Sequence, residues 1–269
     1  MKTIGALMLL MSLAGTAWAQ ETSVPNVADE AGSTPLGLIF DQGAIVVDAP
    51  GTFSRIEDFV IFKRPDGGYA ILSSISADDG SYQITASWQY DDMWRAKSAS
   101  GHSKTNGVER KIEIRKSEGK AFMQRRTVSA GGEMRFDEFT AECGDDCLID
   151  MSPAALPMSV MARRFDAQKG GAQAFKWVGV SLIADQVLTD GLATISRNRT
   201  LNVDGAEITH WRFVEDLKDP AGNPMQMNAH LWTDAAGHLR KFGMGRNPKP
   251  TTVGIRESDT PLSAQMPAE

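Results

Sequence analysis

Most of this chain consists of short segments in which apolar and polar residues alternate, and this period of two constrains its fold more than any other feature. Residues 59–62 and 69–72 flank a Pro-Asp-Gly-Gly turn at residues 65–68, and the three pieces together predict a β-hairpin. The same alternation recurs in later segments, at residues 82–88, 110–116, 121–129, 134–139, 176–182, 192–199, 206–214, 225–233 and 239–244. Because strands with one apolar and one charged face are typical of antiparallel sheets wetted on one side, we expect a mainly β protein.

Residues 154–165 break this pattern and predict a helix. Ser152 is placed as its N-cap and Pro153 as its first residue, and glycines follow the segment. Its apolar residues recur at a spacing near 3.6, at Leu156, Val160, Met161 and Phe165. We therefore expect a large curved antiparallel sheet, resembling half a barrel, with this helix covering its opening. The alternative is two small β domains joined by the helix.

Residues 1–19 have the features of a cleavable signal peptide. Lys2 gives a basic start, an apolar run follows at residues 4–14, and Ala17 and Ala19 are the small residues that signal peptidase requires. We expect cleavage between Ala19 and Gln20. The apolar run is short for a hydrocarbon core of about 30 Å, so we expect a periplasmic protein with no integral membrane segment after cleavage.

The two ends of the mature chain differ in composition from its middle. Residues 20–35 are polar and irregular, and residues 246–269 contain four of the prolines and few large apolar groups. We expect both to be flexible segments outside the core. Residues 36–245 are then expected to form a single β-rich domain.

Cys143 and Cys147 are the only cysteines of the chain. In an oxidising compartment, two cysteines four positions apart around a Gly-containing turn are predicted to form a local disulfide. Asp145 and Asp146 lie between them and would raise the pKa of a thiol, which disfavours a redox pair. A redox role and a metal site remain the alternatives.

Charge and motifs exclude several classes of function. The formal net charge is −6, from 34 acidic and 28 basic residues spread along the chain, so nucleic acid is not an expected partner. The sequence contains neither a Gly-x-Ser-x-Gly elbow nor a phosphate-binding glycine motif. His210 and His230 flank a turn and can approach each other across a hairpin, but their spacing is not that of a metal motif. We predict no catalytic residue, no metal site and no cofactor.

Aromatic residues remain as the informative set. Trp177, Trp211, Phe213 and Trp232 lie on predicted strands, where large rings can build either a solid core or the wall of an apolar ligand site. Both interpretations stay open from the sequence. We take these four residues as the candidate ligand-binding residues.

The order of features resembles uncharacterised periplasmic β-rich families related in architecture to lipoprotein carriers of the LolA and LppX type. The resemblance rests on Asp150, Ser152-Pro153, residues 161–164 and the Leu-Trp-x-Asp-x-x-Gly-x-Leu motif at residues 231–239. It implies an incomplete barrel that shelters an apolar cavity under a helical lid, with no catalytic residues.

Three functions follow as expectations from the composition and this resemblance. The first is a non-enzymatic periplasmic protein that binds a lipid or another apolar ligand, or assists envelope assembly. The second is a protein-interaction or structural module of the envelope, with a protein partner there. The third is a hydrolase or lyase whose site has no recognised motif.

Overall fold

The computed structural model describes residues 37–48, 54–203, 205–218, 224–245 and 252–256. The expected signal peptide and the segment 20–35 lie outside the described residues. The described strands and helix are β1 (Leu38–Asp48), β2 (Arg55–Lys63), β3 (Tyr69–Ala77), β4 (Tyr82–Tyr90), β5 (Ala96–Thr105), β6 (Val108–Ser117), β7 (Lys120–Val128), β8 (Met134–Glu142), β9 (Cys147–Ser152), α3 (Pro157–Arg164), β10 (Ala172–Ser181), β11 (Val187–Val203), β12 (Ala206–Lys218), β13 (Pro224–Asp234), β14 (Leu239–Gly245) and β15 (Thr252–Arg256).

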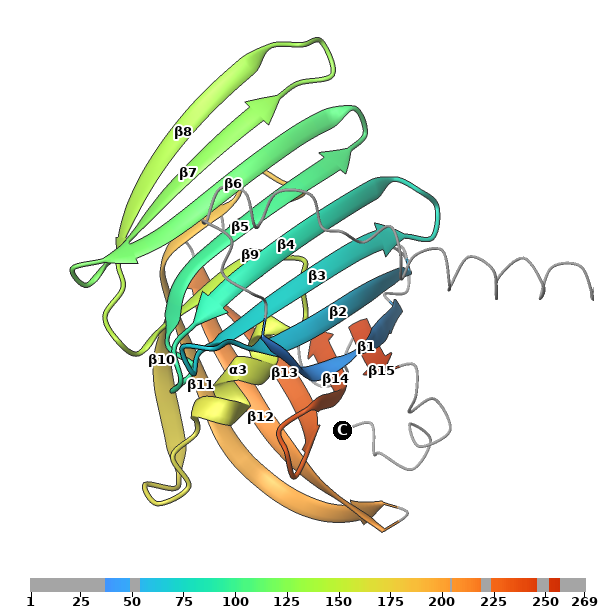
Figure 1. Ribbon diagram of the computed structural model, residues 1–269, viewed down its shortest axis with the longest axis vertical. Helices are drawn as coiled ribbons and strands as arrows, with labels where there is room; N and C mark the ends of the chain where they lie inside the picture. The colour runs from blue at the N-terminus through green and yellow to red at the C-terminus, as the bar shows by residue number, and fades with distance from the viewer. Residues whose placement is uncertain (1–36, 49–53, 204, 219–223, 246–251, 257–269) are drawn as a thin grey trace, which may run out of the picture. The chain divides into compact units, whose positions relative to one another are not determined.

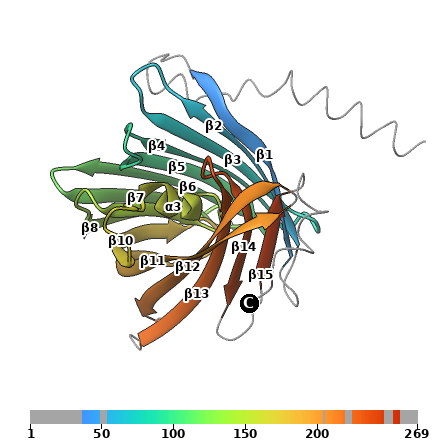
Figure 2. The same cartoon turned by 90° about the horizontal axis from the view of Figure 1, so that it is seen from below.

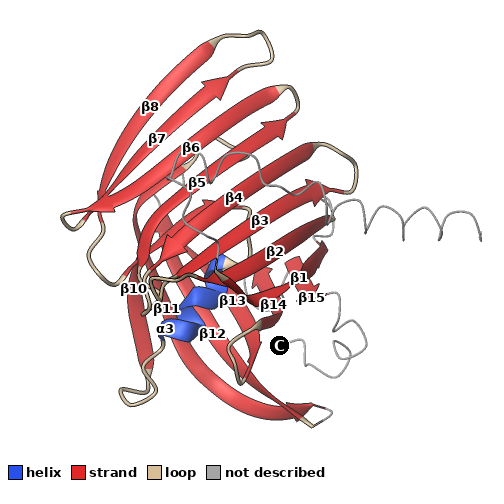
Figure 3. Ribbon diagram, in the orientation of Figure 1, coloured by secondary structure: helices blue, strands red, loops and turns tan. Residues whose placement is uncertain are grey.

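These strands form a 15-stranded sheet in the order β8-β7-β6-β5-β4-β3-β2-β1-β15-β14-β13-β12-β11-β10-β9 (Figure 1). Neighbours from β1 to β8 and from β10 to β15 pair antiparallel, as strands joined by connections of a few residues do. β15 pairs with both β1 and β14 and so joins the two halves into one sheet. The expectation of a mainly β, antiparallel fold with a short helix is confirmed (Figure 3).

The sheet curls on itself instead of lying flat (Figure 2). Its edge strand β9 contacts β5, and its other edge strand β8 contacts β11, although neither pair is hydrogen-bonded as a ladder. Gly101 of β5 allows this approach, because a Cβ atom there would lie 2.7 Å from the side chain of Leu182 and 3.2 Å from the sulfur of Met151. Both faces of β9 are therefore covered.

α3 lies on the concave side of the curled sheet, between β9 and β10 in the chain (Figure 2). β9 and β10 pair parallel, as the two strands of such a crossover do. The expected start at residues 152–154 is wrong: Ser152 ends β9, where it pairs with Ser181, and the helix begins at Pro157. The Ser152 carbonyl accepts a hydrogen bond from the Leu182 N–H, and Leu156, not Ser152, occupies the N-cap position.

Several strands carry no clear alternation of large apolar residues, and the sequence did not indicate them. They are β1, β5, β9 and β15. β5 reads Ala-Lys-Ser-Ala-Ser-Gly-His-Ser-Lys-Thr, because small residues are needed where β9 packs on it. The expected tail at residues 246–269 is corrected for Thr252–Arg256, which form β15 inside the sheet.

Candidate functional site

Side chains of β10 to β14 alternate between an inner face, which is turned toward α3, and an outer face. On the inner face the Trp177 ring lies 5.7 Å from the Phe213 ring, centroid to centroid. The Trp211 ring contacts Phe165, the C-cap of α3, at 5.1 Å. The structure thus brings together three of the four predicted aromatic residues, and all three are buried.

Trp232 lies apart from these three residues, on the outer face. It pairs with His210 across β12 and β13, whereas its neighbour Leu231 pairs with the inner-face residue Trp211. The Trp232 ring stacks on the His210 ring at 4.6 Å with an interplanar angle of 9°, and the side chain is 1% exposed. Grouping Trp232 with an interior under the helix is therefore corrected, since adjacent strand residues point to opposite faces.

The two histidines expected to meet across the hairpin do so on this outer face. His210 Nε2 lies 3.0 Å from His230 Nδ1, and His210 Nδ1 lies 2.9 Å from the Asn198 amide nitrogen. Among the described residues, no group of three or more His, Cys, Asp or Glu side chains is placed to hold a metal ion. The histidine pair is part of a packed polar and aromatic cluster with Trp232.

Two carboxyl groups lie among the inner-face side chains. Glu215 follows Phe213 by two residues on β12 and is 5% exposed, while Asp150 on β9 is half-buried. Burial raises the pKa of Glu215 to about 7. Burial, and then the nearby Glu215 charge, raise the pKa of Asp150 to about 8. At neutral pH Asp150 is therefore largely protonated and Glu215 is protonated in about half of the molecules. A protonated carboxyl can donate as well as accept hydrogen bonds.

A third buried carboxyl, Glu57 of β2, anchors the segment before α3. Its oxygens accept hydrogen bonds from the Ala155 N–H at 2.7 Å, the Leu156 N–H at 3.4 Å and the Ser73 hydroxyl at 2.9 Å. Burial raises the pKa of Glu57, and these hydrogen bonds and the Arg55 charge oppose that rise. Glu57 therefore has a structural role at the helix start, where backbone N–H groups otherwise have no partner.

An aromatic cluster holds the other end of α3. Trp94 follows β4 with φ of 61°, which is unusual for a bulky residue, and its ring stacks on Tyr69 at 3.9 Å. The Arg163 guanidinium lies 4.6 Å from the Trp94 ring centroid and 5.1 Å from that of Phe40. Burial lowers the pKa of Arg163 to about 10. These cation–π contacts connect α3 with β1 and the β4–β5 turn.

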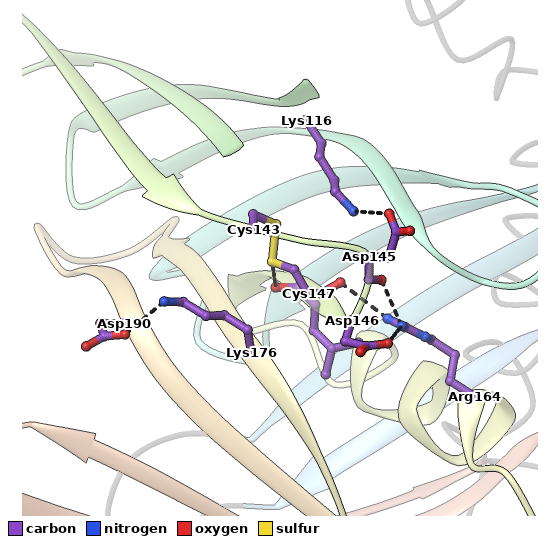
Figure 4. Close-up of a disulfide and its surroundings, with 9 residues drawn as sticks. Lys116, Cys143, Asp145, Asp146, Cys147, Arg164, Lys176 and Asp190 are labelled. Atoms are coloured by element: carbon purple, nitrogen blue, oxygen red, sulfur yellow. Dashed lines mark hydrogen bonds and ion pairs between the residues drawn. A yellow bond between two sulfur atoms is a disulfide. The ribbon is translucent and has the colours of Figure 1, made fainter. Parts of the chain in front are cut away.

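The predicted disulfide between Cys143 and Cys147 is confirmed, and Figure 4 shows its surroundings. Both cysteines are fully buried. Arg164 of α3 donates to the Asp145 carbonyl at 2.9 Å and to the Asp146 carboxylate at 3.3 Å. The disulfide loop thus holds the last turn of the helix against the entry to β9.

The raised pKa values of Asp150 and Glu215 predict a dependence of stability on pH. A carboxyl group whose pKa is raised by folding contributes its full stability to the folded protein only below its unfolded pKa, which is 3.8 for Asp150 and 4.5 for Glu215. This contribution is lost as the pH rises through the folded pKa values of about 8 and about 7. We expect the free energy of unfolding to fall between pH 5 and pH 8. Glu215→Gln removes one of these titrating groups, so its free energy of unfolding relative to the wild type should be about 2 kcal/mol higher at pH 8 than at pH 5. Urea unfolding at both pH values measures this, and an equal effect at both would contradict it.

No functional role was predicted from the sequence for Glu57, Asp150 or Glu215. A signal was present: the inner positions of β12 read Trp211, Phe213 and Glu215, so an acid continues an apolar series of period two. An acidic residue at a predicted core position indicates a candidate functional group, since an unpaired carboxyl is costly to bury.

No helix among the described residues has the length and apolar character needed to cross a bilayer. The chain matches no protein-family model and no curated protein.

Two solved structures are similar to the chain. A β-barrel-like protein of the domain of unknown function DUF1849 from Brucella abortus is 11% identical with a TM-score of 0.50, over 80% of this chain and 94% of that one. A DUF1089 family protein from Pseudomonas aeruginosa is 17% identical with a TM-score of 0.42, over 69% of this chain and 86% of that one. The likeness to the Brucella protein shows the fold alone, a β-barrel-like architecture of uncharacterised families.

Proposed function

We propose that this protein is exported to the periplasm and there acts without catalysis, by binding a lipid or another apolar ligand at the inner face of its curled sheet. The observation that carries the proposal is the pair of carboxyl groups Asp150 and Glu215 on a face made mostly of aromatic and aliphatic side chains. Such groups destabilise a filled core, and proteins retain them where they serve a site. The lipoprotein-carrier resemblance of the sequence supports the same class of function.

Further features support a ligand at this face and an oxidising compartment. Phe165 and Leu188 pack against the core and stay partly exposed, so apolar surface of this face is in contact with solvent. The disulfide between Cys143 and Cys147 is of the kind that persists outside the cytoplasm. The signal-peptide features of residues 1–19 support export from the cytoplasm.

Tryptophan fluorescence with a fatty-acyl probe tests ligand binding. We expect saturable quenching, because Trp177 and Trp211 line the inner face, and a smaller signal from Trp177→Ala. Native mass spectrometry of protein purified from its own cell envelope should show a lipid-sized adduct on a chain that begins at Gln20. Absence of both quenching and adduct would overturn the binding proposal, and a chain that retains Met1 would overturn export.

One observation favours an envelope interaction module as the second candidate. Phe122, Met134 and Phe136 share one face of β7 and β8 and are 45%, 53% and 70% exposed. β8 is an edge strand of the sheet. Exposed apolar side chains on an edge strand are typical of interaction sites, so a stoichiometric protein partner in the same mass spectrum would favour this candidate.

A further inference from the structure

Glu215 is the most unusual group of the inner face. It is 5% exposed, and within the described part of the chain no hydrogen bond or salt bridge reaches its carboxyl group. Burial is the cause that raises its pKa. A carboxyl in this position is normally paired with a cation or surrounded by hydrogen-bond donors. The position therefore has the chemistry of a binding group whose partner comes from outside the chain.

The titratable groups around Asp150 and Glu215 are acidic. Asp150 faces Glu215, Glu57 and the hydroxyl of Tyr90, and its hydrogen-bonding neighbour is the Met151 backbone N–H. Two basic residues that act on the neighbouring Tyr90 and Glu57 are bound elsewhere. Arg164 donates to the disulfide loop, and Arg55 donates to the Pro153 carbonyl at 2.8 Å. No basic side chain of the described residues neutralises Asp150 or Glu215.

Aromatic rings adjoin both carboxyl groups. Phe213 lies two residues before Glu215 on the same face of β12, and its ring contacts Trp177. Trp177 lies two residues before Gly179, which pairs with Asp150. Gly179 has no side chain between the two strands, and a Cβ atom there would lie 3.1 Å from the Cβ of Asp150. Carboxylates next to the faces of indole and phenyl rings are the chemistry that binds ammonium groups.

We propose that the ligand of this protein is an amphiphile with an ammonium head, which Asp150 and Glu215 bind against the rings of Trp177 and Phe213. The alkyl part of the ligand lies along the apolar inner face. This inference rests on the proposed function and names its ligand class. A bound cation favours the ionised carboxyl groups, so binding releases protons and affinity rises with pH across the raised pKa values of the pair.

Isothermal titration with three probes of equal chain length tests the inference: decyltrimethylammonium, decanol and decanesulfonate, each below its micelle concentration. The quaternary ammonium has no titratable proton, so any pH dependence belongs to the protein. We expect the cationic probe to bind at least about tenfold more tightly than the other two, and about tenfold more tightly at pH 9 than at pH 6.

Glu215→Gln and Asp150→Asn should each weaken the cationic probe about tenfold and reduce its pH dependence, while decanol binding stays unchanged. Glu207→Gln, which removes an exposed carboxyl from the same strand, is the matched control and should bind all probes as the wild type does. Circular dichroism verifies that each variant is folded. If only one of the two variants folds, that variant is sufficient for the test.

The outcomes separate the inference from the proposed function. Equal binding of the three probes, unaffected by Glu215→Gln or Asp150→Asn, would overturn the inference that the ligand has an ammonium head. It would leave the proposal of apolar-ligand binding in place. Preference for decanesulfonate would do the same. Binding of none of the probes, together with no quenching by the fatty-acyl probe, would overturn the proposed function.

Discussion

Replacement of Trp232 by alanine is expected to lower the free energy of unfolding by about 3 to 5 kcal/mol, the range for truncating a large buried ring. The side chain is 1% exposed and packs with Val203 and Ile208 in a cluster of its own on the outer face. Its ring also stacks on His210 and lies 5.0 Å from the Lys241 ammonium. The packing and the ring contacts are lost together in the variant.

Urea unfolding followed by circular dichroism measures this change, and Trp232→Phe serves as the matched control because it keeps an aromatic ring beside His210. We expect the phenylalanine variant to lose less than half as much stability as the alanine variant. Binding of the fatty-acyl probe by the folded fraction of Trp232→Ala should stay at the wild-type level, since Trp232 lies on the face opposite Trp177 and Trp211. Lost binding with unchanged stability would show that the outer face is the ligand site.

Replacement of Glu57 by alanine is the second change with a large expected effect, a loss of about 2 to 4 kcal/mol. The Ala155 and Leu156 N–H groups and the Ser73 hydroxyl lose a buried acceptor, and water does not reach the site because Glu57 is fully buried. The segment that positions the start of α3 then has no fixed contact with β2. Near-UV circular dichroism should change along with the midpoint of urea unfolding.

Glu57→Gln is the control for this role, because its amide oxygen still accepts one of the hydrogen bonds. It should lose about 1 kcal/mol or less relative to the wild type. If Glu57→Ala were as stable as the wild type, Glu57 would not anchor the helix, and a ligand role for this third carboxyl would have to be tested with the ammonium probe.

The alternation of apolar and polar residues by itself determined that this chain forms an antiparallel sheet, because a face that is buried along a strand repeats every second residue. A spacing near 3.6 in one segment indicated the short helix. The Cys143–Cys147 pairing also followed from the sequence, because a separation of four residues leaves a loop short enough for the two cysteines to meet. The meeting of His210 and His230 was also predicted from the sequence, because both flank one hairpin turn, and the register makes them diagonal neighbours on one face of β12 and β13.

Only the tertiary structure decided which face is inner. Period two places Trp211 and Phe213 on one face and His210 on the other, but it does not say which face meets α3, and so it placed Trp232 wrongly. Curling of the sheet also places β9 against β5, a contact between residues far apart in the chain that no local pattern encodes. The same long-range packing brings Asp150 of β9 near Glu215 of β12. Burial raises the pKa of both groups, and the Glu215 charge raises that of Asp150 further; neither effect is encoded in a local segment of the sequence.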